Sequence, residues 1–335
     1  MTNIKLKISR HQQMLHKVVI VDGFPGCGKT MLSPIVSAFE RVELMQYAPL
    51  IEQMCELWGL NRVDDDVAAA MIKMNADLLI YNAMMGRNTN CRPKDLSSIF
   101  RHRPFEYIKR MFRKGDELIP NIISEKTPIL HLATHMLLPH ASPLFEALGD
   151  KLVFIEVVRH PLYMIIQQEK NIEKINDARF QHIRYALNDD EYTFYCSGWE
   201  DIFNNSNNFE RAIYSIEWYY SKIFSNEHKS SMIIPFELFV KKPEQYMQKI
   251  SSELGDSVSK RVKKKMVEQK VPRKQLSDGP ALDIYKKCGW VPPRSSSEEY
   301  ELEVRRELVA RNVSPEALAV LDKISEQYIE TYLAN

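Results

Sequence analysis

Short apolar runs of strand length alternate along this chain with longer segments of helical periodicity. Residues 17–21 and 151–158 are almost continuous apolar runs, which is typical of strands buried on both faces of a sheet. Residues 232–236 form a third run of this kind. Each run is followed by a segment that carries helix start signals. We therefore expect an α/β fold with three layers, in which a central parallel sheet lies between helices and carries helical insertions.

Caps and glycines mark the boundaries of the predicted helices. The segment from Pro49 to Leu60 reads as a helix, and so does the Ala- and Met-rich segment that an aspartate at 64–66 caps and Gly86 ends. Ser314-Pro315-Glu316 combines a cap, a first-turn proline and an acidic first turn. The other expected elements are a short strand at 40–44 and helices that start at 161, at 211 and at 243.

Composition divides the chain into three parts. Residues 1–16 form a polar, basic tail, and residues 17–259 form the expected α/β domain. Within this domain, residues 87–120 are a basic insertion and residues 175–209 a polar one. Residues 260–335 begin with a basic run at 260–274, continue as a Pro/Ser-rich segment and end in helices expected to pack on the same domain. Both basic segments are typical of solvated surface, and the alternative is that they bind the anionic groups of a ligand.

Overall composition predicts an ordinary globular protein. The 335 residues are 44% hydrophobic and 27% charged, and the net charge of +1 gives no sign of a nucleic-acid partner. Five scattered cysteines form no C-x-x-C pair, so we expect neither a zinc site nor a disulfide framework. No apolar run approaches the length of a membrane span, and the first 16 residues lack the apolar core of a signal peptide. We expect a cytoplasmic protein.

A glycine loop follows the first predicted strand and matches the pattern G-x-x-x-x-G-K-[ST] at every required position. The strand, the loop and the following helix come in the order that a phosphate-binding loop requires. Glycines let backbone N–H groups turn toward phosphate oxygens, and the helix N-terminus adds the positive end of its dipole. The expected phosphate-binding residues are those of the loop: Gly23, Phe24, Pro25, Gly26, Cys27, Gly28, Lys29 and Thr30.

A second candidate phosphate ligand lies at the end of the strand at 151–158. Arg159 follows this strand directly, and ligands of open parallel sheets bind beyond the carboxyl ends of the strands. Its guanidinium can donate two parallel hydrogen bonds to a phosphate. The alternative is an arginine that pairs with a carboxylate of the protein.

Taken in order, four segments resemble the sulfotransferase family. The first is the strand–loop–helix unit with Phe24-Pro25, and the second is Ser124-Glu-Lys-Thr-Pro128. The third is Phe154-Ile-Glu-Val-Val-Arg-His-Pro161, which is similar to the family's strand ending in R-[ND]-P. The fourth runs from Ile234-Pro-Phe-Glu237 through Lys242-Pro243 to Leu254-Gly255. Their order and spacing agree over about residues 17–255.

The resemblance implies a nucleotide sulfate donor, 3′-phosphoadenosine-5′-phosphosulfate, and transfer of its sulfuryl group to a hydroxyl or amine. It implies that the loop holds the 5′-phosphosulfate, that Lys29 stabilises the bridging oxygen, and that Arg159 binds the 3′-phosphate. Two positions depart from the family: Gly26 replaces its usual lysine or arginine, and Gln167 replaces a serine beside the 3′-phosphate. We expect Gln167 to assist through its amide, and we expect no metal.

Four residues are candidates for the general base. His135 lies in Thr134-His-Met-Leu-Leu-Pro139, a segment similar to the one that carries the base in cytosolic sulfotransferases. Glu125, with Lys126 beside it, is the second candidate. Glu52 and Glu56 lie after the loop and are the others. The residues alone do not choose among them.

The sequence is also compatible with two other functions. A kinase for a small molecule would use the complete Walker-type loop with Mg²⁺ and ATP, but neither Asp22 nor Glu156 is an obvious ligand for the metal. A nucleotide-binding module without chemistry would use the loop alone. The acceptor and the oligomeric state cannot be read from the sequence.

Overall fold

Five strands form one parallel sheet in the order β2-β3-β1-β4-β7. The computed structural model describes residues 6–115, 117–175, 177, 180–225, 231–279 and 297–334. The strands are β1 (Lys17–Gly23), β2 (Gln46–Tyr47), β3 (Ile129–Ala133), β4 (Leu152–Val158) and β7 (Met232–Pro235). All of their carboxyl ends therefore meet at one edge of the sheet, where residues that follow different strands come together.

The centre of the sheet is buried on both faces. In β1, residues 18–21 are fully buried, because β3 and β4 pair with the strand on both sides. Ile20 lies opposite Leu132 on one side and Phe154 on the other. This burial on both faces explains why β1 and β4 read as continuous apolar runs.

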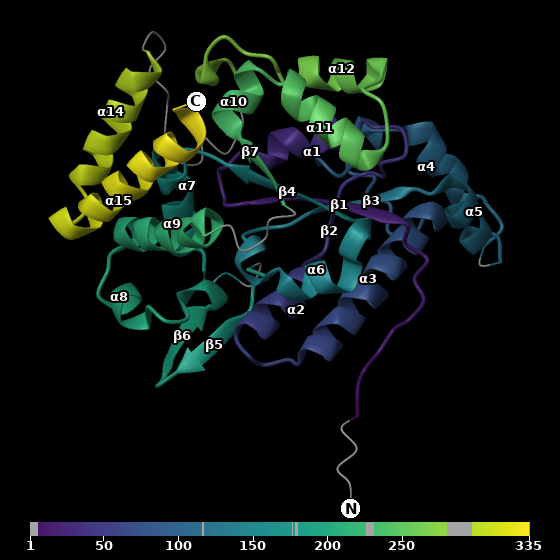
Figure 1. Cartoon of the computed structure of the whole chain (residues 1–335), viewed down its shortest axis with the longest axis horizontal. Coiled ribbons are helices and arrows are strands. Elements are labelled where there is room, and N and C mark those ends of the chain that lie inside the picture. The colour runs from purple at the N-terminus through teal and green to yellow at the C-terminus, as the bar shows by residue number, and fades with distance from the viewer. Residues whose placement is uncertain are drawn as a thin grey trace, which may run out of the picture.

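Helices cover both faces of the sheet, as the sequence predicts. Figure 1 shows α1, α11 and α12 above the sheet and α2, α3 and α6 below it. The helices are α1 (Lys29–Val36), α2 (Pro49–Gly59), α3 (Asp65–Met85), α4 (Pro104–Met111), α5 (Ile119–Lys126), α6 (Ser142–Leu148), α7 (Ile165–Glu173), α8 (Glu200–Asn204), α9 (Asn208–Phe224), α10 (Phe236–Lys241), α11 (Glu244–Leu254), α12 (Lys260–Glu268), α14 (Glu298–Ala310) and α15 (Pro315–Tyr328). The α/β fold class is thus confirmed.

Several predicted boundaries are confirmed by the cap geometry. Gly86 and Gly255 adopt left-handed conformations just after α3 and α11, and the Ser314 hydroxyl accepts a hydrogen bond from Ala317 N–H at the start of α15. Helix α9, which was expected to start at 211, begins earlier, at Asn208, where Asn207 and Glu210 form a reciprocal capping box.

Three segments differ from the sequence prediction. The strand expected at 40–44 is a single bridge between Val42 and Ile129, and β2 follows at 46–47. The basic insertion 87–120 contains α4 and the start of α5, which the sequence analysis did not predict. The polar insertion 175–209 contains an antiparallel hairpin of β5 (Arg184–Leu187) and β6 (Asp190–Thr193).

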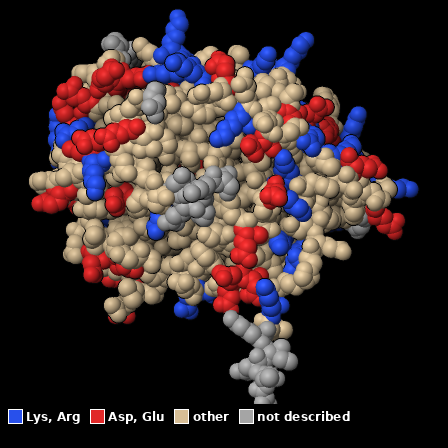
Figure 2. Space-filling view, in the orientation of Figure 1, with Lys and Arg blue, Asp and Glu red and all other residues tan. Residues whose placement is uncertain are grey.

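Charge is spread over the surface in both signs. Figure 2 shows Lys and Arg interspersed with Asp and Glu on the face it draws, in keeping with the net charge of +1. Within the described ranges, no helix is both long and apolar enough to cross a bilayer. The predicted Pro/Ser-rich segment lies mostly outside the described residues, and the division of the chain near residue 260 stays a prediction.

Candidate functional site

The glycine loop leaves the sheet at the carboxyl end of β1 and runs into α1. Three of its glycines, at positions 23, 26 and 28, have positive φ angles of 147°, 90° and 111°. At Gly28 a methyl group would lie 2.3 Å from Cδ2 of Phe236, so both the backbone conformation and the neighbouring ring exclude a side chain there. The loop conformation therefore depends on glycine.

The remaining loop residues divide into anchors and exposed groups. Phe24 is buried against Tyr219, with ring centroids 5.5 Å apart, and the side chain of Cys27 is also buried. Burial raises the pKa of the Cys27 thiol to about 11, so it is a neutral packing group at physiological pH. Pro25 is half-buried, and Thr30 is exposed in the first turn of α1.

Lys29 is the cation of the loop. Its side chain folds back so that Nζ donates to Gly23 O at 2.8 Å, and the residue is only 7% exposed. Burial raises the pKa of Glu52 and lowers that of His135, and the charge of Lys29 acts on both groups in the lowering direction, so all three lie within electrostatic reach of one another. An anion bound in the loop would offer Lys29 a stronger acceptor than a backbone carbonyl.

Arg159 and Gln167 both approach the glycine loop at Gly26. The Arg159 guanidinium donates to Gly26 O at 3.1 Å, and a methyl group at Gly26 would lie 3.2 Å from Gln167 Oε1. Tyr220 holds the backbone of Arg159 in place, because its hydroxyl accepts from Arg159 N–H at 3.0 Å and contacts Arg159 O. The two predicted 3′-phosphate ligands thus lie beside the loop.

Arginines and aromatic rings form a continuous stack around Arg159. Its guanidinium carbon lies 4.5 Å from the centroid of Tyr163 and 4.3 Å from that of Phe236. Arg305 covers Tyr163 at 4.8 Å, and Arg273 covers Phe236 at 5.5 Å. Cation–π contacts of this kind stabilise guanidinium groups away from water. Arg273 belongs to the predicted basic run 260–274, for which solvated surface was the favoured interpretation and ligand binding the alternative. Arg305 lies beyond the segments that resemble the family and was not predicted as a site residue.

His135 and Glu52 form a hydrogen-bonded pair near Lys29. His135 follows β3, Glu52 lies on α2, and the Glu52 carboxylate accepts the His135 backbone N–H at 2.6 Å. The same oxygen lies 3.1 Å from His135 Nδ1. Burial lowers the pKa of His135 well below its usual 6.5, and the charge of Lys29 lowers it further. The imidazole is therefore neutral at neutral pH and able to accept a proton at Nε2.

A second histidine–glutamate pair lies beside the first. His182 Nδ1 lies 2.5 Å from Glu56 Oε1, and Ile183 N–H donates to the other oxygen at 2.7 Å. The rings of His135 and His182 meet edge to face with centroids 6.0 Å apart. Burial opposes the charge of His182, but the hydrogen bond and the charge of Glu56 outweigh it and raise its pKa. Glu56 thus partners His182, a residue that sequence reasoning missed.

Two acidic side chains lie under the loop but are turned into the protein. Asp22 is fully buried and accepts from the Thr134 hydroxyl at 2.9 Å and from Leu137 N–H at 2.8 Å. Glu156 is also fully buried and accepts from the Tyr219 hydroxyl at 2.8 Å. Burial, together with the charge of Asp22, raises the pKa of Glu156 well above its usual value.

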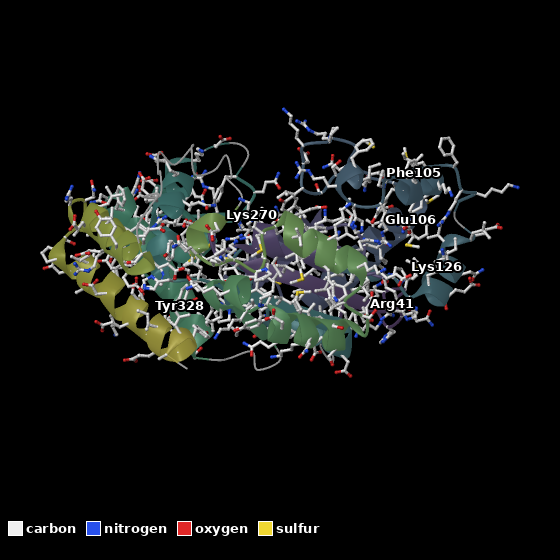
Figure 3. All side chains as sticks on the ribbon, turned by 90° about the horizontal axis from the view of Figure 1, so that it is seen from above. Arg41, Phe105, Glu106, Lys126, Lys270 and Tyr328 are labelled. Carbon is white, nitrogen blue, oxygen red and sulfur yellow. The ribbon has the colours of Figure 1, made fainter. Side chains whose placement is uncertain are left out.

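Glu125 and Lys126 do not lie beside the loop. They end α5, just before β3 begins, and both side chains are exposed. The amino ends of parallel strands lie at the opposite edge of the sheet from the glycine loop, about 15 Å away for a strand of this length. The structure thus brings His135 and Glu52 to the loop and leaves Glu125 and Lys126 outside it. Figure 3 shows Lys126 at one end of the molecule, beside Arg41.

Among the described residues, no group of three or more His, Cys, Asp or Glu side chains is arranged to hold a metal ion.

The sequence matches no family model and no curated protein, whereas several solved structures resemble the fold. The sulfotransferase domain of the Synechococcus PCC 7002 olefin synthase is 12% identical, with a TM-score of 0.41 over 92% of this chain and 100% of that one. Sulfotransferase STF9 from Mycobacterium avium is 11% identical, with a TM-score of 0.42 over 97% and 78%. The sulfotransferase from Alicyclobacillus acidocaldarius is 12% identical, with a TM-score of 0.34 over 92% and 96%. At these identities and scores the likeness carries no weight for activity.

Proposed function

We propose that this protein is a cytoplasmic sulfotransferase that moves a sulfuryl group from 3′-phosphoadenosine-5′-phosphosulfate to a hydroxyl or amine. The observation that carries the proposal is the meeting of three groups at one edge of the sheet. These are the glycine loop with Lys29, the strand-end Arg159, and the His135–Glu52 pair. The loop and Arg159 belong to the segments that resemble the sulfotransferase family. His135 lies in a further segment, similar to the one that carries the base in cytosolic members of that family.

In the proposed reaction, the loop amides and Lys29 bind the 5′-phosphosulfate of the donor. Lys29 exchanges its bond to Gly23 O for one to the oxygen that bridges phosphorus and sulfur. As the bond between sulfur and this oxygen breaks, negative charge develops on the oxygen, and the ammonium stabilises it. The acceptor oxygen or nitrogen forms the new bond to sulfur, with the reacting groups in line.

The acceptor must lose a proton as the new bond forms. We assign this proton to His135 Nε2, because the ring is neutral and Glu52 lies 3.1 Å from its Nδ1. An ionised Glu52 fixes the tautomer with the proton on Nδ1 and stabilises the imidazolium that forms. Glu52 is then a positioning residue and His135 the base.

We assign the 3′-phosphate of the donor to Arg159 and Gln167, which lie next to Gly26. The Tyr163 hydroxyl offers one more donor, because it is buried next to Arg159 and has no hydrogen-bond partner among the residues that the structure describes. Arg273 and Arg305 add positive charge to the same stack.

Small-molecule phosphorylation is the second candidate function. The complete loop favours it, since Thr30 is exposed where a Walker-type loop places its metal-binding hydroxyl. A kinase would need a carboxylate near the loop to hold Mg²⁺. Asp22 directly precedes the loop and Glu156 lies beside it in the sheet, but both are buried and accept hydrogen bonds within the protein. We therefore rank this function second.

The test is donor turnover in the presence of a metal chelator. We expect release of adenosine 3′,5′-bisphosphate from the sulfate donor when a panel of hydroxyl and amine acceptors is added. Lys29→Met should abolish the release, and Glu125→Ala, a change at the opposite edge of the sheet, should leave it unchanged. Consumption of ATP that requires Mg²⁺, with no turnover of the sulfate donor, would contradict the proposal and show that the protein is a kinase.

A further inference from the structure

Helix α4, in the basic insertion, has its polar and apolar faces reversed relative to an ordinary surface helix. Its buried residues are Tyr107 and Arg110, which are 4% and 1% exposed. Phe105 is 81% exposed, and Phe112, the residue that caps the helix, is 84% exposed. A surface helix normally buries its apolar stripe and exposes its charges.

A polar network fixes the inward face of α4. The Arg110 guanidinium donates to both oxygens of Glu43, at 2.6 and 2.9 Å, and Tyr107 donates to Glu43 at 2.8 Å. Glu43 is itself 2% exposed. Turning the helix to bury the phenylalanines would separate this buried ion pair. The ion pair therefore fixes the orientation of α4 and keeps its apolar face exposed.

The outward face is a continuous apolar stripe. With 100° between successive residues, Phe105, Ile108 and Phe112 fall on the side opposite Tyr107 and Arg110. Ile108 is 38% exposed, and the neighbouring side chains Phe100 and Met111 are each 51% exposed. Figure 3 shows Phe105 and Glu106 at the end of the molecule opposite Tyr328.

Positive charge surrounds this stripe. Lys109 shares the outward face, and Arg101 and Lys114 are exposed at either end of the segment. The one carboxylate of the helix, Glu106, bonds to Arg110 and lies 3.3 Å from Arg103, so its charge is compensated. The basic insertion around α4 thus carries a local excess of positive charge, and the run at 260–274 carries another, although the whole chain has a net charge of only +1.

We propose that α4 docks this protein on membrane surfaces that contain anionic lipid. An apolar stripe rimmed by lysine and arginine is the pattern of a helix that lies in the plane of the bilayer interface, with its rings among the acyl chains and its cations near the headgroups. The eight residues of α4 span about 12 Å, which is far too short to cross a bilayer. This docking is independent of the proposed sulfuryl transfer.

The test is co-sedimentation of the full chain with vesicles. One set is phosphatidylcholine alone, and the other contains about one part in three phosphatidylserine. We expect binding to the anionic vesicles, weakened by salt, and an affinity at least tenfold lower for the double variant Phe105→Ser/Phe112→Ser. Lys109→Gln and Lys114→Gln should each weaken binding about five-fold. Ile202→Ser is the matched control, because this side chain is 47% exposed on α8, outside the basic insertion.

Each other outcome contradicts the proposal. Equal binding to both vesicle types would remove the role of anionic lipid, and unchanged binding by the Phe105→Ser/Phe112→Ser variant would remove the role of α4. A wild-type chain that binds neither vesicle type, but forms a dimer that the same variant abolishes, would assign the face to self-association.

Discussion

At the residue scale, the protonation of Glu52 links the fold to the proposed chemistry. Burial raises its pKa to about 7, against the opposing effects of His182, the His135 N–H and Lys29. Below this pH the folded protein holds a neutral Glu52, which cannot stabilise a protonated His135. The same group lowers stability as pH rises from about 4.5 to about 7, because over that range the folded chain binds a proton that the unfolded chain has lost.

We expect kcat/KM for sulfuryl transfer to rise as pH increases through about 7. The rise should follow ionisation of Glu52, which then orients His135 and stabilises its charged form. In Glu52→Gln this limb of the pH profile should disappear, and turnover should be uniformly low. A Glu52→Gln variant with the wild-type profile would show that another group controls the reaction.

Arg159 should determine recognition of the 3′-phosphate. We expect Arg159→Lys to raise the Kd of adenosine 3′,5′-bisphosphate about 10- to 100-fold, because lysine keeps the charge but loses the fork and the stacking on Tyr163 and Phe236. The Kd of adenosine 5′-phosphate, measured by calorimetry on the same preparation, should change less than two-fold. Equal losses for both nucleotides would argue against a 3′-phosphate contact.

Sequence reasoning found some residues of the site and missed others for a physical reason. The loop and Arg159 follow strands directly, so their position at the sheet edge is fixed by the strand that precedes them. His182 lies 126 residues from its partner Glu56, in a polar insertion, and no spacing relates the two. Glu125 resembled a family motif, but the sequence did not show that a strand begins just after it.

At the element scale, the turn from β1 into α1 depends on Gly28. We expect Gly28→Ala to lower the free energy of unfolding by roughly 1–3 kcal/mol and to abolish nucleotide binding. Its φ of 111° disfavours a side chain, and the new methyl would meet Phe236. Urea unfolding and nucleotide titration measure the two effects.

Gly198→Ala provides the matched control for this change. Its φ is 92°, and an added methyl group would meet nothing within 4 Å. It should show the cost of the backbone conformation alone and keep full nucleotide binding. Similar losses in both variants would mean that the contact with Phe236 has no effect.

The strands also show which elements the sequence can predict. β1, β4 and β7 are apolar runs, and they were predicted within one or two residues. β3 was missed because it has five residues and a histidine at its centre, His131, whose Nδ1 lies 2.8 Å from the Ser37 hydroxyl oxygen. α4 was missed because its reversed faces place a buried arginine where an apolar residue is expected.

At the scale of the whole molecule, the buried pair of Glu43 and Arg110 ties the basic insertion to the core. We expect Arg110→Ala to lower the free energy of unfolding by about 3–5 kcal/mol, because it leaves the Glu43 carboxylate buried without its cation. Lys109→Ala, on the exposed face of the same helix, should change it by less than about 0.5 kcal/mol. Comparable values for the two variants in urea unfolding would show that the ion pair does not anchor the insertion.

The central claim, a site for a 3′-phosphorylated nucleotide sulfate donor, is tested most directly by thermal stabilisation of the full chain with nucleotides. Ligand at about 100 times its Kd should add roughly 2.7 kcal/mol to the stability. We predict that adenosine 3′,5′-bisphosphate raises the Tm with or without Mg²⁺, and that ADP raises it less. A rise with ATP that requires Mg²⁺, and none with the 3′,5′-bisphosphate, would contradict the account.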